Sequence, residues 1–260
     1  MALHPIHELA LCSGIGGISL GLKLALGDRH RTVCHVERDS YAAAVLVARM
    51  EDEALDYAPV WDCLETFDGA AWRGCVDIVT AGYPCQGFSS AARGRHKQLD
   101  LWPQVKRIVK QCQPSGVFLE NVSHAQTSLT NAGRDLLGMG FRVAGLAGKA
   151  SGVGAPYART RLFLLAVANG NSESVLSVHD ETSGLSCGAG PWYQIRRSRN
   201  GRVAYGPSRR MERLRAVGNA VVPVVAAKAF LSLAKCLPRV KTRSWVCAES
   251  HSPRPHTRVG

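Results

Sequence analysis

The chain has 260 residues, of which 46% are hydrophobic, and this is enough for one full α/β core with a small appendage. Its formal net charge of +12 and pI near 9.6 favour a polyanionic partner. Nine cysteines without a C-x-x-C pair argue against a disulfide framework or a zinc site, and free thiols suit a reducing compartment. Neither a signal peptide nor a run of ~18 apolar residues is found, so we expect a cytoplasmic protein without metal or membrane partner.

In chain order, segments with strand character alternate with segments whose apolar residues recur at helical spacing. Parallel strands joined by helices predict an α/β fold with a doubly wound sheet. The expected strands are 7–11, 32–36, 76–79, 116–119, 141–146 and 162–167, and the expected helices are 18–26, 39–49, 101–112, 131–139 and 221–233.

A glycine-rich loop follows the first expected strand. Its glycines let the backbone approach a ligand closely, and the helix that follows presents free amide donors. The second strand ends in Glu37, at the separation from the loop at which an acid commonly binds a ribose hydroxyl. This pattern indicates a cofactor that contains adenosine. It does not distinguish a dinucleotide from other adenosine cofactors.

Two reactive side chains follow neighbouring strands. Cys85 lies just past the strand at 76–79, and Glu120 follows the strand at 116–119. In open α/β sheets the carboxyl ends of the strands line the crevice that binds the substrate. A thiol and a carboxylate at one sheet edge indicate a nucleophile with a group that manages the proton.

An ordered set of motifs extends this pattern: GIGG, VERD, VWDC, GYPCQGFS, LENV, ARTRLFLLA and AVGNAVVP. Over roughly residues 6–235 the chain resembles the DNA (cytosine-5) methyltransferases of bacteria and phages. The resemblance implies a Rossmann-like, S-adenosyl-L-methionine-dependent methyltransferase sheet. It departs from the family pattern at Ala10, Cys12, Arg38 and Tyr157, where the family often has Asp, Phe, an aromatic residue and Gln. The cofactor contacts implied are Cys12, Ser13, Gly14, Gly16, Gly17, Glu37 (ribose), Arg38, Asp62 (adenine), Gly82, Pro84 and Asn219.

The implied reaction explains the reactive residues. The thiolate of Cys85 adds to carbon 6 of cytosine, and carbon 5 then attacks the methyl group. Glu120 hydrogen-bonds ring nitrogen 3 and the exocyclic amine. Arg159 and Arg161 are candidates for holding the base and for lowering the pKa of the thiol. Because carbon 6 is inaccessible inside a duplex, the target base must be flipped out.

Two basic segments are the candidate contacts to double-stranded DNA. Residues 87–98 have the composition of a mobile lid. Residues 170–209 fall where the family has its target-recognition domain, here shortened, and arginine can bind phosphate or the edge of guanine. The expected division is therefore 1–169 catalytic and cofactor-binding, 170–209 target recognition, 210–236 a return to the catalytic domain, and 237–260 a disordered basic tail. The DNA-binding candidates are Ser89, Arg93, Arg95, Lys97, Arg196, Arg197, Arg199 and Arg202.

Three alternatives stay open on the sequence alone. A nicotinamide-dependent oxidoreductase would use the glycine loop and Glu37 but leave Cys85 without a role. A tRNA cytosine-5 methyltransferase would share the main motifs, and a DNA-binding relative could keep the fold without catalysis. The favoured interpretation is a DNA (cytosine-5) methyltransferase of the restriction–modification type, acting as a monomer on DNA in a bacterial host cell.

Overall fold

The computed structural model describes residues 4–86, 99–169, 207–237 and 246–248. Its main feature is an eight-stranded sheet with the order β10-β8-β9-β7-β4-β1-β2-β3, accompanied by a two-stranded sheet of β5 and β6. The strands are β1 (Ile6–Leu11), β2 (His30–Val36), β3 (Val60–Trp61), β4 (Ile78–Ala81), β5 (Cys85–Gln86), β6 (Leu99–Asp100), β7 (Gly116–Val122), β8 (Phe141–Lys149), β9 (Thr160–Ala168) and β10 (Val246–Ala248).

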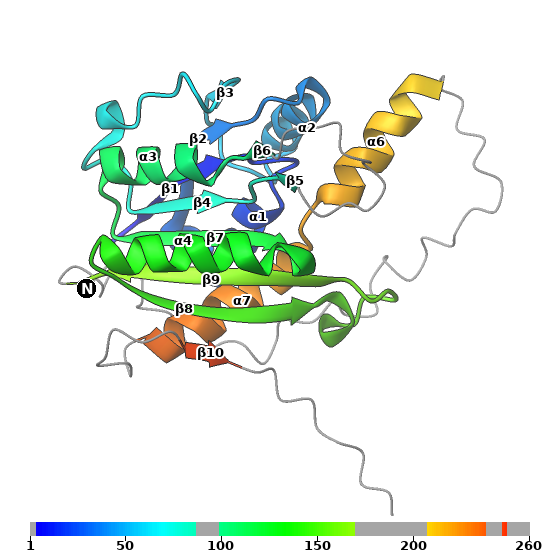
Figure 1. The fold of residues 1–260 in the computed structure, drawn as a ribbon. Helices are drawn as coiled ribbons and strands as arrows, with labels where there is room; N and C mark the ends of the chain where they lie inside the picture. The colour runs from blue at the N-terminus through cyan, green and yellow to red at the C-terminus, as the bar shows by residue number, and fades with distance from the viewer. Residues whose placement is uncertain (1–3, 87–98, 170–206, 238–245, 249–260) are drawn as a thin grey trace, which may run out of the picture.

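Helices connect and cover these strands on both faces. In Figure 1, α3 and α4 lie on one face of the sheet and α1 and α7 lie on the other, while α6 extends away from the sheet. The helices are α1 (Gly17–Leu26), α2 (Ser40–Glu51), α3 (Trp102–Cys112), α4 (Gln126–Gly138), α6 (Pro207–Asn219) and α7 (Pro223–Cys236).

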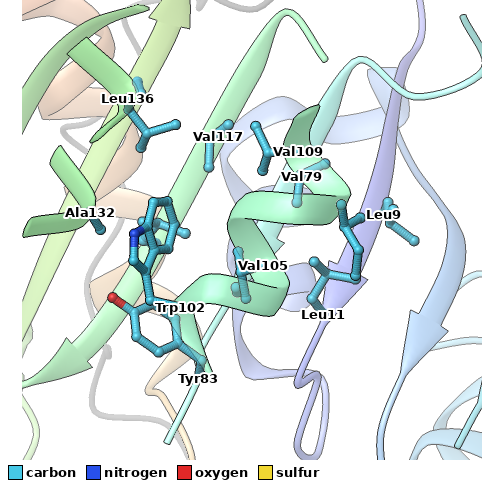
Figure 2. Close-up of a cluster of buried hydrophobic side chains, with 14 of the residues drawn as sticks. Leu9, Leu11, Val79, Tyr83, Trp102, Val105, Val109, Val117, Ala132 and Leu136 are labelled. Atoms are coloured by element: carbon cyan, nitrogen blue, oxygen red, sulfur yellow. The ribbon is translucent and has the colours of Figure 1, made fainter. Parts of the chain in front are cut away.

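The two faces of the sheet form two hydrophobic cores, because successive side chains of a strand point to opposite faces. Leu9, Val79 and Val117 pack against α3 and α4, as Figure 2 shows. Ile78 and Phe118 face the other way and pack against α1 and α7. A strand that is covered on both faces has a nearly continuous apolar sequence. For this reason these strands could be predicted from the sequence.

The direction of one strand corrects the sequence prediction. The strands β1, β2, β3, β4 and β7 run parallel, but β9 is antiparallel to both of its neighbours, β7 and β8. The expectation that all strands run parallel is therefore wrong for β9. The physical reason is that β8 and β9 are joined by a short turn at 150–159 without a crossover helix, and such a connection pairs strands antiparallel.

The helices α1 and α7 approach each other closely. A Cβ atom on Gly21 of α1 would lie 2.7 Å from the Cβ of Ala226 and 2.8 Å from the carbonyl oxygen of Pro223. Glycine is therefore required at this crossing. The stretch Arg215–Cys236 is long and apolar enough to cross a membrane by length and composition alone, but α7 within it contributes many buried side chains to the core.

The six expected strands and five expected helices are confirmed as elements, with ends that differ by a few residues. Among the described residues, four strands and one helix were not predicted. The strands β3, β5 and β6 have two residues each, too few to show a period, and α6 is an arginine-rich helix without an apolar stripe. Within the tail expected to be disordered, β10 pairs with β8 at the sheet edge.

Candidate functional site

The glycine-rich loop lies at the carboxyl end of β1 and is a tight turn. Cys12, Gly14 and Gly16 have positive φ angles of 49°, 55° and 79°. No atom lies within 4 Å of a Cβ built on Gly14, so the space above this residue is open. A Cβ on Gly17 would lie 2.6 Å from the carbonyl oxygen of Val221, so this glycine lets the loop pack against the segment that precedes α7. The loop is thus a fixed turn with an open side toward a ligand.

The carboxylate of Glu37 is oriented by two backbone amides. Its Oε2 atom accepts a hydrogen bond from the Gly14 N–H at 2.6 Å, and its Oε1 atom accepts one from the Asp39 N–H at 2.8 Å. A carboxylate offers about four lone-pair sites, so acceptor capacity remains for hydroxyl groups of a ligand. Glu37 and the glycine loop therefore form one unit at the ends of β1 and β2.

The other expected cofactor contacts occupy the surrounding surface. Arg38 and Asp62 are exposed, and Asp62 directly follows β3 at the sheet edge next to β2. Asn219 is exposed at the end of α6. The side chain of Cys12 is largely enclosed, and burial, with the negative charges of Glu37 and Glu65, raises the pKa of its thiol to about 12. Cys12 is therefore a neutral thiol that lines the loop.

The segment that leads into Cys85 is held on the end of β7. Ala81 pairs with Leu119 in the parallel register, so Gly82 continues beside Glu120. A Cβ on Gly82 would lie 3.2 Å from Oε2 of Glu120. Glycine at this position lets the backbone approach the carboxylate.

The amide of Asn121 fixes the same segment. Its Nδ2 atom donates to the carbonyl oxygen of Tyr83 at 3.2 Å, and its Oδ1 atom accepts from the backbone N–H of Val122 at 2.9 Å. Tyr83 is itself buried against Trp102, with ring centroids 6.1 Å apart (Figure 2). We did not single out Asn121 from the sequence, although it directly follows Glu120 in the LENV motif.

Glu120 is buried beside a cation. Its side chain is 7% exposed, and Oε1 lies 2.8 Å from Nε of Arg161, whose side chain is 13% exposed. The two groups form an ion pair, but their angles are not those of a hydrogen bond, so both atoms lack a hydrogen-bond partner among the described residues. Burial raises the pKa of Glu120 to about 7, against the lowering effect of Arg161 and Arg159. A carboxyl group with this pKa can give and take a proton near neutrality.

Arg159 joins the start of β9 to the end of α6. Its guanidinium donates to the backbone carbonyl of Val217 at 3.2 Å and also to that of Gly218. These carbonyls belong to the last turn of α6, where a cation is favourable. Burial, together with the charge of Arg161, lowers the pKa of Arg159 from its usual value. The structure thus brings Glu120, Arg159 and Arg161 to the same end of the sheet.

Cys85 is described through its backbone. It forms β5 with Gln86 and pairs antiparallel with Asp100 of β6. It follows exposed Pro84 just after the end of β4, the edge at which Glu120 lies. The expected DNA contacts at 87–98 and 170–206 lie outside the described residues, namely Ser89, Arg93, Arg95, Lys97, Arg196, Arg197, Arg199 and Arg202.

A buried polar cluster beneath the glycine loop was not predicted. It comprises Glu8 of β1, His30 and Thr32 of β2, and Thr80 of β4, all almost fully enclosed. The sequence shows these residues only as polar side chains in otherwise apolar strands. That they contact one another depends on how β1, β2 and β4 pair. In the part of the chain that is described, no group of three His, Cys, Asp or Glu side chains is placed to hold a metal ion.

Comparisons with known proteins agree with the motifs. The family profile of the C-5 cytosine-specific DNA methylases matches residues 6–186. The Type II methyltransferase M.CviJI of Paramecium bursaria Chlorella virus IL3A is 32% identical over 167 residues, which cover 62% of this chain and 43% of the viral protein. M.NgoMIV of Neisseria gonorrhoeae is 31% identical over 121 residues, covering 44% of this chain and 35% of its own length. The matched part thus spans less than half the length of these relatives.

Solved structures show the same architecture. A DNA modification methyltransferase encoded within a prophage (E. coli) is 26% identical, with a TM-score of 0.50, and the match covers 63% of this chain and 47% of that one. A DNMT2 variant of Spodoptera frugiperda, 22% identical, has a TM-score of 0.52 over 64% of this chain and 51% of its own. This second likeness concerns the fold alone, and it agrees with the expected Rossmann-like methyltransferase sheet.

Proposed function

Because the chain belongs to the C-5 cytosine-specific DNA methylase family, we propose that it transfers a methyl group from S-adenosylmethionine to carbon 5 of cytosine in double-stranded DNA. The observation that carries the proposal is the buried Glu120–Arg161 pair beside Gly82, at the start of the segment that leads into Cys85. A nicotinamide-dependent oxidoreductase would have no use for this arrangement.

The residues at the ends of β1, β2 and β3 fit the methyl donor. The glycine loop has an open side at Gly14, which suits the amino-acid part of the donor. Glu37 is oriented by two amides and keeps acceptor sites for the ribose hydroxyls. Asp62, at the next strand end, is exposed and available to the adenine amine. Arg38, Gly82, Pro84 and Asn219 complete the proposed pocket. When bound, the donor supplies an electrophilic methyl group.

Cys85 and Glu120 act together on the cytosine ring. The Cys85 thiolate forms a bond to carbon 6, and the electron pair of the carbon 5–carbon 6 double bond shifts into the ring. Glu120, with a pKa of about 7, delivers a proton to ring nitrogen 3 and so prevents a full negative charge. Carbon 5 becomes an enamine carbon and accepts the methyl group. After a base removes the carbon 5 proton, the thiolate leaves and nitrogen 3 returns its proton to Glu120.

The arginines support this chemistry by position and charge. The guanidinium of Arg161 lies next to Glu120 and favours the carboxylate form to which the proton returns. Arg159 binds the end of α6 and so holds Asn219 near the site. Exposed Arg213 and Arg215 on α6, and the net charge of +12, suit a DNA backbone near this end of the sheet. We further propose that the protein works as a monomer in the cytoplasm of a bacterial host.

The experiment that tests the proposal measures the product directly. The full chain is incubated with tritiated S-adenosylmethionine and either duplex DNA or bulk tRNA, and DNA from expressing cells is sequenced after bisulfite treatment. We expect label in DNA and protected cytosines in a short sequence context. Label in tRNA alone would replace DNA by tRNA as the substrate. Label in neither, with the donor still bound, would identify a relative that has lost catalysis.

A further inference from the structure

The buried polar cluster under the glycine loop is organised around a carboxylate. Glu8 Oε2 interacts with His30 Nε2 at 2.9 Å and accepts from the Thr32 hydroxyl at 2.8 Å, while Oε1 accepts from the Thr80 hydroxyl at 2.5 Å. Burial opposes ionisation of Glu8, but His30 and Thr80 outweigh it and lower its pKa to about 2. A fixed negative charge therefore lies between the sheet and α1.

A shift in register brings a further histidine to the same face. Glu8 pairs with Thr32, but the next residue, Leu9, pairs with Cys34, so Val33 is an extra residue in β2. Beyond this point the alternation of side chains is reversed, and His35 pairs with Ala10 on the face of Glu8. Without the extra residue, His35 would point into the opposite core.

His35 binds the glycine loop through one hydroxyl group. Its Nδ1 atom lies 3.1 Å from Oγ of Ser13, and this hydroxyl donates its own hydrogen to the carbonyl oxygen of Ala10 at 2.8 Å. Since a hydroxyl has one hydrogen, Oγ must accept from an N–H at Nδ1 of His35. His35 is fully buried, and its Nε2 atom has no hydrogen-bond partner among the described residues. Burial lowers its pKa, so the ring is neutral.

Ser13 is the centre of the turn at residues 12–14, whose open side at Gly14 is the proposed place of the amino-acid part of the methyl donor. The residues on both sides of it have positive φ, 49° at Cys12 and 55° at Gly14. A left-handed conformation is strained for a residue other than glycine, and it persists only where its surroundings hold it. The bond from His35 to the Ser13 hydroxyl is one such constraint, together with the Ser13 N–H to Val36 carbonyl bond at 3.1 Å.

We propose that His35 is a positioning residue for the methyl donor: through the Ser13 hydroxyl it holds the turn at residues 12–14 in the conformation that binds the amino-acid part of S-adenosylmethionine. This inference rests on the proposed function. The histidine is out of reach of any ligand because it is fully buried, so its effect is transmitted through Ser13.

The test is calorimetric binding of S-adenosylmethionine to the full chain and to five variants. His35→Leu removes the donor at similar volume, whereas His35→Asn keeps an N–H close to the place of Nδ1. Ser13→Ala and the double variant His35→Leu/Ser13→Ala complete a cycle. Cys34→Ala is the matched control, because Cys34 is also buried in β2 but packs in the opposite core. Thermal unfolding of each variant verifies that it is folded.

We expect His35→Leu and Ser13→Ala each to raise Kd roughly tenfold, as for one lost hydrogen bond. His35→Asn should stay within about threefold of the wild type, and Cys34→Ala should bind as the wild type does. The double variant should bind no more weakly than the weaker single variant, because both changes break one interaction. If His35→Leu does not fold, Ser13→Ala and His35→Asn carry the test.

Three results would overturn the inference. The first is wild-type affinity in Ser13→Ala or His35→Leu. The second is a double variant whose loss is the product of the single losses, since His35 would then act by another route. The third is equal weakening in Cys34→Ala, which would indicate general loss of stability. A wild-type chain that does not bind the donor would instead overturn the proposed function, and the inference with it.

Discussion

The buried carboxyl group of Glu120 makes the stability of the fold depend on pH in an unusual direction. Its pKa rises from 4.5 to about 7 on folding, chiefly by burial. Between these values the folded protein binds more protons than the unfolded chain, so stability is lost as pH rises through the window from about 4.5 to about 7. At about 1.36 kcal/mol per pH unit, the difference corresponds to about 3 kcal/mol in the free energy of unfolding.

Glu120→Gln removes this ionisation while it keeps the shape of the side chain. Relative to the wild type, the variant should gain about 2.5 kcal/mol of stability between pH 5 and pH 8, the part of the window that lies between these conditions. Comparing the two proteins at each pH cancels the contributions of other groups, such as Glu8. Methyl transfer should meanwhile slow roughly a hundredfold or more, because Gln cannot deliver a proton to nitrogen 3.

Urea unfolding of wild type and variant at both pH values measures the effect. Glu51→Gln is the matched control for the loss of one carboxylate, because Glu51 is exposed at the end of α2. A difference between Glu120→Gln and wild type that is equal at both pH values would refute the assigned pKa. An unchanged turnover rate would remove Glu120 from the proton transfer.

The remaining predictions concern the nucleophile, the DNA contacts and the core. Cys85→Ser should abolish transfer of tritium to DNA while the donor still binds, because a serine hydroxyl is far less ionised than a thiol; activity near wild type would exclude Cys85 as nucleophile. Single changes to Ala at Arg196, Arg197, Arg199 and Arg202 should mostly lower the salt slope of DNA binding by about one unit, and at least one should relax the methylated context; no change in either readout would place recognition elsewhere. Phe230→Ala should destabilise the fold by about 3–5 kcal/mol in urea unfolding, because this ring is fully buried 5.4 Å from the ring of Phe118; a loss below about 1 kcal/mol would contradict that packing.

The sequence predicted the elements that bury apolar runs, and it predicted which strand ends carry reactive groups. It placed Glu37 and Glu120 after strands; Glu37 directly follows β2, whereas Glu120 lies near the end of β7, which extends to Val122. Local patterns could not predict the direction of β9, because direction depends on how the chain turns after β8. They could not predict α6 either, because its arginine-rich sequence lacks an apolar period.

The contacts inside the site depend on three-dimensional register, which no local pattern contains. The Asn121 amide reaches Tyr83 only because β4 and β7 pair so that Ala81 lies beside Leu119. His35 reaches Ser13 only because β2 has one extra residue at Val33. Both residues are visible in the sequence as polar groups near a motif, but their partners are 38 and 22 positions away.

The close crossing of α1 and α7 has a consequence for how such a protein can diversify. In the sequence, residues 170–206 connect β9 to α6, and the chain continues into α7, which packs closely against α1 at Gly21. Both sides of the stretch thus connect to the same core. Doubling the length of a connecting segment costs only about 0.6 kcal/mol in closure entropy. If target choice resides in residues 170–206, as the expected division of the chain has it, recombination could exchange this segment as a unit and change the DNA specificity while the rest of the domain is inherited unchanged.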